Sequence, residues 1–138
     1  SKFPLDARPV ESPLYPTSNA DRNVIWLRIK PEFQGTLKPA DGLSVVLFMS
    51  DFSMIRVAFE IYQKSNIRTN TSSLHHSVWI HESMPDPLGW FLVVSECETI
   101  SHGRARIESR IFDESRKCVM SVVQEAYFQR LPDIKPKL

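Results

Sequence analysis

The pattern of apolar and polar residues divides the chain into one long apolar segment and several shorter, strand-like segments. Apolar side chains recur from residue 43 to residue 61 without a glycine or a proline. This segment is too long for one strand, so we predict a helix from about residue 42 to about residue 63, capped by Asp41. Because the apolar positions cover every side of this helix, we expect it to lie at the centre of the fold.

β-Strands are predicted on both sides of this helix. Residues 24–30 are rich in β-branched and aromatic side chains, and residues 31–39 after them read as a loop. Strand-like segments at residues 76–82, 90–99, 104–112 and 117–130 are separated by short turns rich in proline, glycine and aspartate. These spacings favour an antiparallel meander, and together with the helix they predict an α+β fold whose sheet curls around the helix.

The domain organisation follows from the same pattern. A length of 138 residues suits a single domain. Residues 1–19 contain four prolines and little periodicity, so we expect an extended lead-in that connects to an upstream segment. The domain is expected to span residues 20–131, and residues 132–138 are expected to form a flexible tail.

Composition narrows the possible partners. Seventeen basic residues balance sixteen acidic ones, which gives no electrostatic reason to expect a nucleic acid or an anionic membrane as the partner. We find no run as long as a transmembrane helix and no signal peptide. Cys97 and Cys118 are expected to be free thiols in a reducing, intracellular setting. Neither Cys-x-x-Cys nor His-Glu-x-x-His spacing occurs, so we predict no metal and no cofactor.

Two polar residues stand out from apolar surroundings. Asp51 lies inside the predicted helix, and Arg56, five positions later, is not a same-face partner. Either Ser50 or Asp51 caps a second helical segment after a break, or Asp51 is a functional acid in a buried setting. In the last strand, alternation places Gln124 on an otherwise apolar face. Its amide either satisfies a stray backbone group or serves a functional site.

Hydroxyl and imidazole side chains gather after the predicted helix, at Ser72, Ser73, His75, His76, Ser77 and His81. A Ser–His–Asp triad with Asp51 is the tempting assignment. We reject it because no Gly-x-Ser-x-Gly turn occurs, and because alternating residues of one strand do not face one another. The histidines are expected to have packing or hydrogen-bonding roles.

Four stretches of this sequence resemble the acyl-CoA thioesterase II family, double-hotdog enzymes that include bacterial and peroxisomal thioesterases. Residues 4–10 with 24–28 resemble the start of its second hotdog, and residues 49–53 (Met-Ser-Asp-Phe-Ser) resemble its Ala-Ser-Asp-Phe/Leu motif. Residues 73–81 (Ser-Leu-His-His-Ser-Val-Trp-Ile-His) resemble its Ser/Thr-Leu/Ile-Asp-His-Ser-Met-Trp-Phe-His signature. Residues 122–126 (Val-Val-Gln-Glu-Ala) resemble its closing Val/Ala-Gln-Glu-Gly. The sequence departs from the family at His75, usually aspartate, and at Ala126, usually glycine.

The resemblance implies the C-terminal hotdog domain, a long central helix wrapped by a curved antiparallel sheet, and hydrolysis of fatty acyl-CoA to free acid and CoA. The family's catalytic aspartate, serine or threonine, and glutamine fall on Asp51, Ser73 and Gln124, which would position the hydrolytic water. Asp51 would accept the water proton. One alternative is a non-catalytic acyl-CoA-binding half that needs an N-terminal hotdog domain. Another is a hotdog enoyl-CoA hydratase, whose usual Asp/His pair is not evident.

The resemblance also implies partners. Acyl-CoA is the expected small-molecule partner, and Arg104, Arg106 and Arg110 share a strand face that is either solvated or docks the CoA phosphates. A lone hotdog leaves an open sheet edge, so we expect a homodimer or pairing with an N-terminal hotdog domain that is absent from this chain. The final Pro-Lys-Leu resembles the Ser-Lys-Leu peroxisomal signal, which favours a peroxisomal over a cytoplasmic location.

Overall fold

The computed structural model of the protein describes residues 3–10 and 22–134. These residues form six strands and one long helix, with two short helical turns before the long helix. The elements are β1 (Leu5–Pro9), β2 (Arg22–Ile29), α1 (Pro31–Gln34), η1 (Pro39–Asp41), α2 (Gly42–Lys64), β3 (Thr69–Ile80), β4 (Phe91–Ser101), β5 (Arg104–Phe112) and β6 (Cys118–Arg130).

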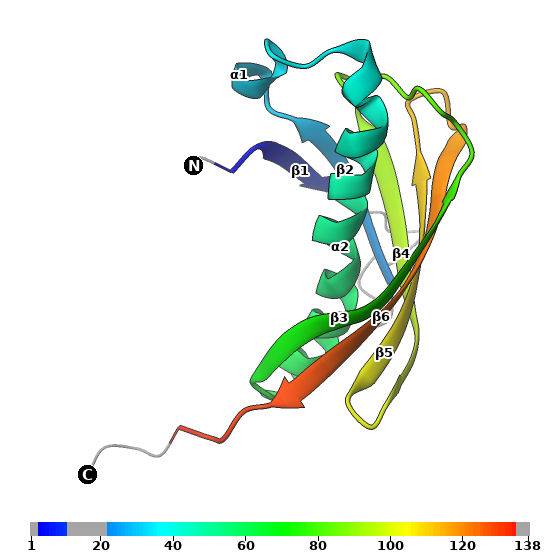
Figure 1. Cartoon of the computed structure of the whole chain (residues 1–138). Coiled ribbons are helices and arrows are strands. Elements are labelled where there is room, and N and C mark those ends of the chain that lie inside the picture. Colours follow the sequence, from blue (N-terminus) through cyan, green and yellow to red (C-terminus); the bar gives the residue numbers. More distant parts are fainter. Residues whose placement is uncertain (1–2, 11–21, 135–138) are drawn as a thin grey trace.

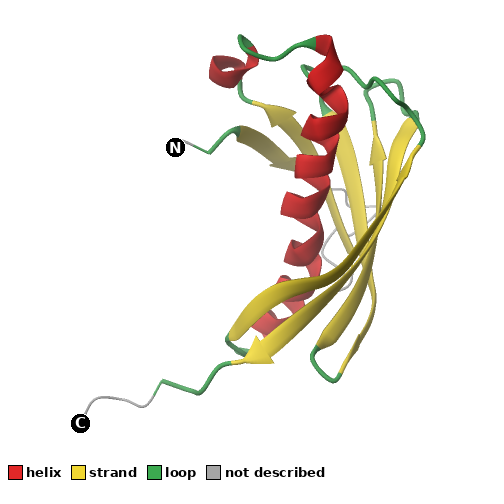
Figure 2. Ribbon diagram, in the orientation of Figure 1, coloured by secondary structure: helices red, strands yellow, loops and turns green. Residues whose placement is uncertain are grey.

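The strands form one antiparallel sheet in the order β1-β2-β4-β5-β6-β3. The sheet is strongly curved, and α2 runs along its concave side (Figure 1). Figure 2 shows the same two layers, with a single long helix against the strands. This arrangement confirms the predicted α+β fold, in which a curved sheet wraps around a long helix.

The core lies between the concave face of the sheet and α2. Strand register places Ile25, Val93, Ile111 and Met120 side by side in β2, β4, β5 and β6, and each is at most 2% exposed. Met49 of α2 belongs to the same buried cluster. Burial of each such side chain contributes roughly 1.5–3 kcal/mol to stability. The helix is therefore held against the middle of the sheet by apolar contact.

The sheet wraps around one side of α2 and leaves the other side open, so the apolar residues on all sides of the helix are not all buried. Phe48, Phe52 and Phe59 are 43%, 37% and 42% exposed. The ring of Phe3 lies 4.9 Å from that of Phe52 and covers part of this side. The segment Pro39–Lys64 is long and apolar enough to cross a membrane, contrary to our expectation, although half of its most apolar stretch is buried inside the protein. A core helix packed on a sheet passes the same test.

The start of α2 is fixed by close packing. Asp41 precedes the helix as predicted, but its carboxylate accepts a hydrogen bond from the backbone N–H of Lys38 at 2.7 Å and makes no capping bond to α2. A Cβ on Gly42 would lie 1.7 Å from the carbonyl oxygen of Pro85. The loop between β3 and β4 therefore sits directly on the first turn of the helix, and only glycine fits there.

Two strand predictions were wrong. Residues 5–9, expected in the lead-in, form β1. Pro9 is tolerated there because it stands at the end of an edge strand, where its missing N–H breaks no ladder bond. β3 begins at Thr69 rather than at residue 76, and it pairs with β6 instead of β4. The meander therefore holds only for β4, β5 and β6. The other residues of the lead-in (1–2 and 11–19) and the end of the tail (135–138) lie outside the described residues.

Candidate active site

Gln124 lies on the concave face of the sheet, as the alternation of β6 predicted. Its side chain is 0% exposed, and its Cα partners are Ile107 in β5 and His76 in β3. Its Nε2 donates a hydrogen bond of 2.5 Å to Oγ of Ser73. Its Oε1 is buried and has no hydrogen-bond partner among the described residues. The amide is thus held in one orientation and keeps an acceptor free.

Ser73 reaches Gln124 by way of a β-bulge. Ser73 and His75 pair with successive residues of β6, so Leu74 is an extra residue in β3. A bulge shifts the alternation of a strand by one position. As a result both Ser73 and His76 face the side of Gln124, whereas uninterrupted alternation would put them on opposite faces. The sequence contains no signal for this bulge, so the position of His76 beside Gln124 could not be predicted from it.

Asp51 is exposed, so the expectation that it is buried is wrong. The reason is that the sheet covers one side of α2, while Asp51 lies outside the row of buried residues formed by Met49, Ser53 and others. The alternative of a helix break is wrong as well, because α2 is continuous and Ser50 donates to the carbonyl of Leu47 within it. Within the described chain, no hydrogen bond or ion pair joins Asp51 to Ser73, Gln124 or any other residue.

The flank of α2 is fixed against β6 by an aromatic contact. The ring of Tyr62 stacks on that of Phe128 with 4.9 Å between centroids. Burial raises the pKa of Tyr62 above its ordinary value, and the nearby Cys97 adds to this increase. Phe128 and Gln124 share the concave face of β6, so this contact anchors the helix beside the strand that carries the buried amide.

Three of the four histidines form local pairs with serines rather than a triad. The closest ring-to-hydroxyl distances are 2.6 Å for His75 with Ser77 and 2.8 Å for His81 with Ser121. In residues 3–10 and 22–134, no carboxylate is bonded to a histidine, and no three His, Cys, Asp or Glu side chains gather as a metal site would require. The described histidines are therefore not arranged to activate a serine as a nucleophile.

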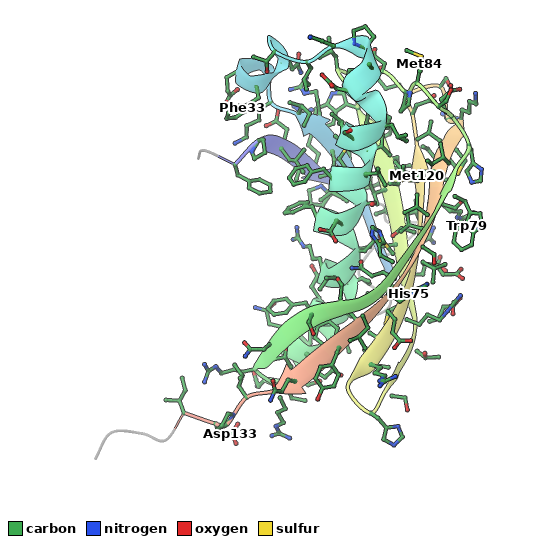
Figure 3. All side chains as sticks on the ribbon, in the orientation of Figure 1. Phe33, His75, Trp79, Met84, Met120 and Asp133 are labelled. Atoms are coloured by element: carbon green, nitrogen blue, oxygen red, sulfur yellow. The ribbon has the colours of Figure 1, made fainter. Side chains whose placement is uncertain are left out.

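The convex face of the sheet carries a hollow and ion-paired arginines. A hollow of about 350 Å³ there is lined by Trp79, Arg110, Ser121 and neighbouring residues, and it does not include Gln124. Trp79 projects from this side (Figure 3). The predicted arginine face also lies here, with Arg104 paired to Glu125 and Arg106 to Glu98 and Glu108. These pairs and the exposure of the arginines agree with the solvated interpretation.

Solved structures of other proteins share this fold. The acyl-CoA thioesterase II TesB2 from Mycobacterium marinum is 22% identical, with a TM-score of 0.75 over 93% of this chain and 50% of that one. The tesB protein of Mycobacterium avium subspecies paratuberculosis is 22% identical, with a TM-score of 0.72 over 91% and 48%. A hypothetical thioesterase from Streptococcus pneumoniae, solved with coenzyme A, is 8% identical, with a TM-score of 0.66 over 93% and 89%.

The matches cover nearly all of this chain but only part of the mycobacterial proteins. The chain spans about half the length of the two mycobacterial proteins. A family model described as the acyl-CoA thioesterase C-terminal domain matches residues 4–128, which include every element from β1 almost to the end of β6. The chain therefore belongs to the acyl-CoA thioesterase C-terminal domain family.

Proposed function

We propose that the protein hydrolyses acyl-CoA thioesters to free acid and CoA, with Asp51, Ser73 and Gln124 around the attacking water. The observation that carries this proposal is the hydrogen bond between Ser73 and the fully buried Gln124. It joins residues of β3 and β6 that fall on two separate motifs of the acyl-CoA thioesterase II family. The CoA-bound structure of the pneumococcal neighbour supports a CoA thioester as the substrate class.

The course of α2 supports the inclusion of Asp51. Both α2 and β6 run from the top of the view to the bottom (Figure 1). Asp51 lies three helical turns before Tyr62, on nearly the same flank and roughly 16 Å back along the axis. Gln124 lies four residues before Phe128 on the same strand face, roughly 13 Å back. Because Tyr62 stacks on Phe128, these offsets favour similar heights for Asp51 and Gln124.

In the proposed mechanism, Asp51 accepts a proton from the water as the water oxygen attacks the thioester carbonyl carbon. The free acceptor of Gln124, Oε1, receives a second hydrogen bond from the same water, and Ser73 keeps the amide in place. The carbon–sulfur bond then breaks, which gives the free acid and CoA. The acyl chain packs against apolar residues between α2 and the sheet.

The substitution Asp51→Asn tests this mechanism, because it removes the base and keeps the shape. We expect kcat for a saturated acyl-CoA to fall on the order of 100-fold or more, with unchanged circular dichroism and thermal unfolding. Glu60→Gln is the matched control, since Glu60 is a carboxylate on the same helix that pairs with Arg56. A folded Asp51→Asn protein with near-normal turnover would remove Asp51 from the site.

We further propose that a second hotdog domain, either a second copy or an N-terminal domain, covers the open side of α2. Three phenylalanines are exposed on α2, and β3 is an edge strand with Leu74 and Ile80 half exposed. An unpaired edge and a large exposed apolar surface favour association. The double length of the mycobacterial relatives fits the same proposal.

The exposure of Asp51 favours a second candidate function, an acyl-CoA-binding half that becomes catalytic only when another domain covers it. Incubation of this chain with saturated and enoyl-CoA substrates separates the possibilities. Release of free CoA from the saturated substrate supports the hydrolase. Binding of an alkyl-CoA thioether without turnover supports the binding half, and water addition to the enoyl substrate supports a hydratase. A peroxisomal location is proposed on the C-terminal residues alone.

A further inference from the structure

His76 differs from the other histidines of the protein. All four histidines lie in the described part of the chain, and three of them share a hydrogen bond with a serine: His75, His81 and His102. His76 has no hydrogen-bond partner among the described residues, and its side chain is exposed to solvent. An imidazole that is both free and accessible can exchange a proton with a bound molecule.

Strand register places His76 beside the candidate site. Its Cα partner across β3 and β6 is Gln124, and directly opposed residues carry their Cβ atoms about 4.5–5.5 Å apart on one face. Val78, two residues along β3, packs against the core, which identifies the face as the concave one. The bulge at Leu74 brings Ser73 to this face as well. His76, Ser73 and Gln124 therefore form a continuous polar group.

The position of His76 within this group suggests which part of a thioester it meets. Gln124 is fully buried, whereas His76 is exposed on an edge strand. The acyl chain needs the buried apolar space, and the large, charged CoA moiety needs the open side. The sulfur atom joins these two parts, so it lies nearer to the exposed imidazole than the carbonyl carbon does.

We propose that His76 is a further catalytic residue, which donates a proton to the leaving sulfur of CoA; this inference rests on the proposed thioesterase function. Water attacks the carbonyl carbon and loses one proton to Asp51. When the carbon–sulfur bond breaks, its electron pair stays on sulfur, and the imidazolium of His76 transfers its N–H proton to that sulfur. The acid product loses its own proton to solvent, and the proton on Asp51 returns through solvent to His76.

The test compares His76→Gln with His75→Gln. His75 is the adjacent histidine, but it faces the opposite side of β3 and is bonded to Ser77. For acyl-CoA substrates, we expect His76→Gln to lower kcat on the order of 100-fold, with little change in KM. Aryl thioesters of the same acyl group release a stable thiolate that needs no proton, so their hydrolysis should be little affected. His75→Gln should leave both rates near those of the unchanged protein.

The results also separate this inference from the proposed function. If Asp51→Asn abolishes hydrolysis and His76→Gln does not, only the role of His76 is lost. If His76→Gln slows aryl and CoA thioesters equally, His76 has a structural role and the inference fails. If the chain alone is inactive, ring NMR signals of the histidines are followed during titration with an alkyl-CoA thioether. A shift at His76 without one at His75 supports contact with the substrate, and the absence of a shift at His76 overturns it.

Discussion

Replacement of Gln124 by methionine should stabilise the protein while it removes activity. Methionine has nearly the length and volume of glutamine and fills irregular core space. The change in stability has two opposing contributions, a lost hydrogen bond and the removal of a buried acceptor. The substitution removes the hydrogen bond from Nε2 to Ser73, a loss of about 0.5–1.5 kcal/mol. It also removes Oε1, a buried acceptor that no described residue satisfies. In the proposed mechanism Oε1 bonds to the attacking water only in the substrate complex, so its burial costs the free protein about 1–3 kcal/mol.

The net change in stability depends on the exposure of Ser73, the hydrogen-bond partner of the Gln124 amide. Ser73 is exposed, so its hydroxyl can bond to water once the amide is gone. We therefore expect Gln124→Met to raise the free energy of unfolding by about 1 kcal/mol, which corresponds to an increase in Tm of about 3–5 °C in a domain of this size. Hydrolysis of acyl-CoA should be lost, because the positioned water loses its acceptor.

The assay is chemical denaturation with parallel measurement of acyl-CoA turnover. Ser109→Ala is the control, because Ser95 and Ser109 are both buried and their hydroxyl oxygens lie 2.5 Å apart. Removal of one hydroxyl leaves the other unpaired in the core, a loss of about 1–3 kcal/mol. If Gln124→Met destabilises the protein as much as Ser109→Ala does, the amide serves the fold and is not a functional residue kept at a cost in stability.

Three further predictions concern helix packing, an ion pair and the C-terminal tail. Gly42→Ala should lower the free energy of unfolding by about 1–3 kcal/mol or more, because its Cβ would overlap the Pro85 carbonyl. Gly35→Ala is the control: its Cβ would meet open space, so its stability in urea denaturation should be unchanged. The hydrogen bond from Lys117, followed by one from the backbone of Met84, lowers the pKa of Glu82. The resulting stability is present above the ordinary pKa of glutamate and lost as pH falls through the lowered one, so Lys117→Met should flatten the acid side of a plot of unfolding midpoint against pH. A fluorescent protein that carries the last twelve residues should collect in peroxisomes and disperse when Leu138 is deleted; diffuse signal from the intact tail would contradict the targeting proposal.

The central helix and the face of Gln124 could be predicted from the sequence because both depend on local pattern. Continuous apolar character over residues 43–61 excluded a strand, and alternation in β6 identified the buried face. The exposure of Asp51 depends on how many sides of α2 the sheet covers. That coverage is a property of the complete sheet and cannot be read from the helix itself.

Dependence on the complete sheet also explains why β1 and the start of β3 could not be predicted from the sequence. β1 is stabilised by pairing with β2, although its own sequence, Leu-Asp-Ala-Arg-Pro, has little strand character. The bulge at Leu74 is defined by the register between β3 and β6, which no local pattern encodes. In the sequence His76 is one of several clustered histidines, and only the strand pairing places it opposite Gln124.

Assembly and activity should be coupled in this protein, because the open side of α2 carries both the exposed phenylalanines and Asp51. A domain seated on Phe52 would also exclude water from around Asp51, which strengthens its electrostatic interaction with a bound substrate. Phe52→Asp should therefore shift the sedimentation profile to monomer and lower turnover in parallel. Phe33→Asp is the control, since Phe33 is 39% exposed and lies on α1, a separate short helix that precedes α2 (Figure 3). A monomeric Phe52→Asp protein with full turnover would show that one hotdog suffices, and the exposed carboxylate would then act without a covering domain.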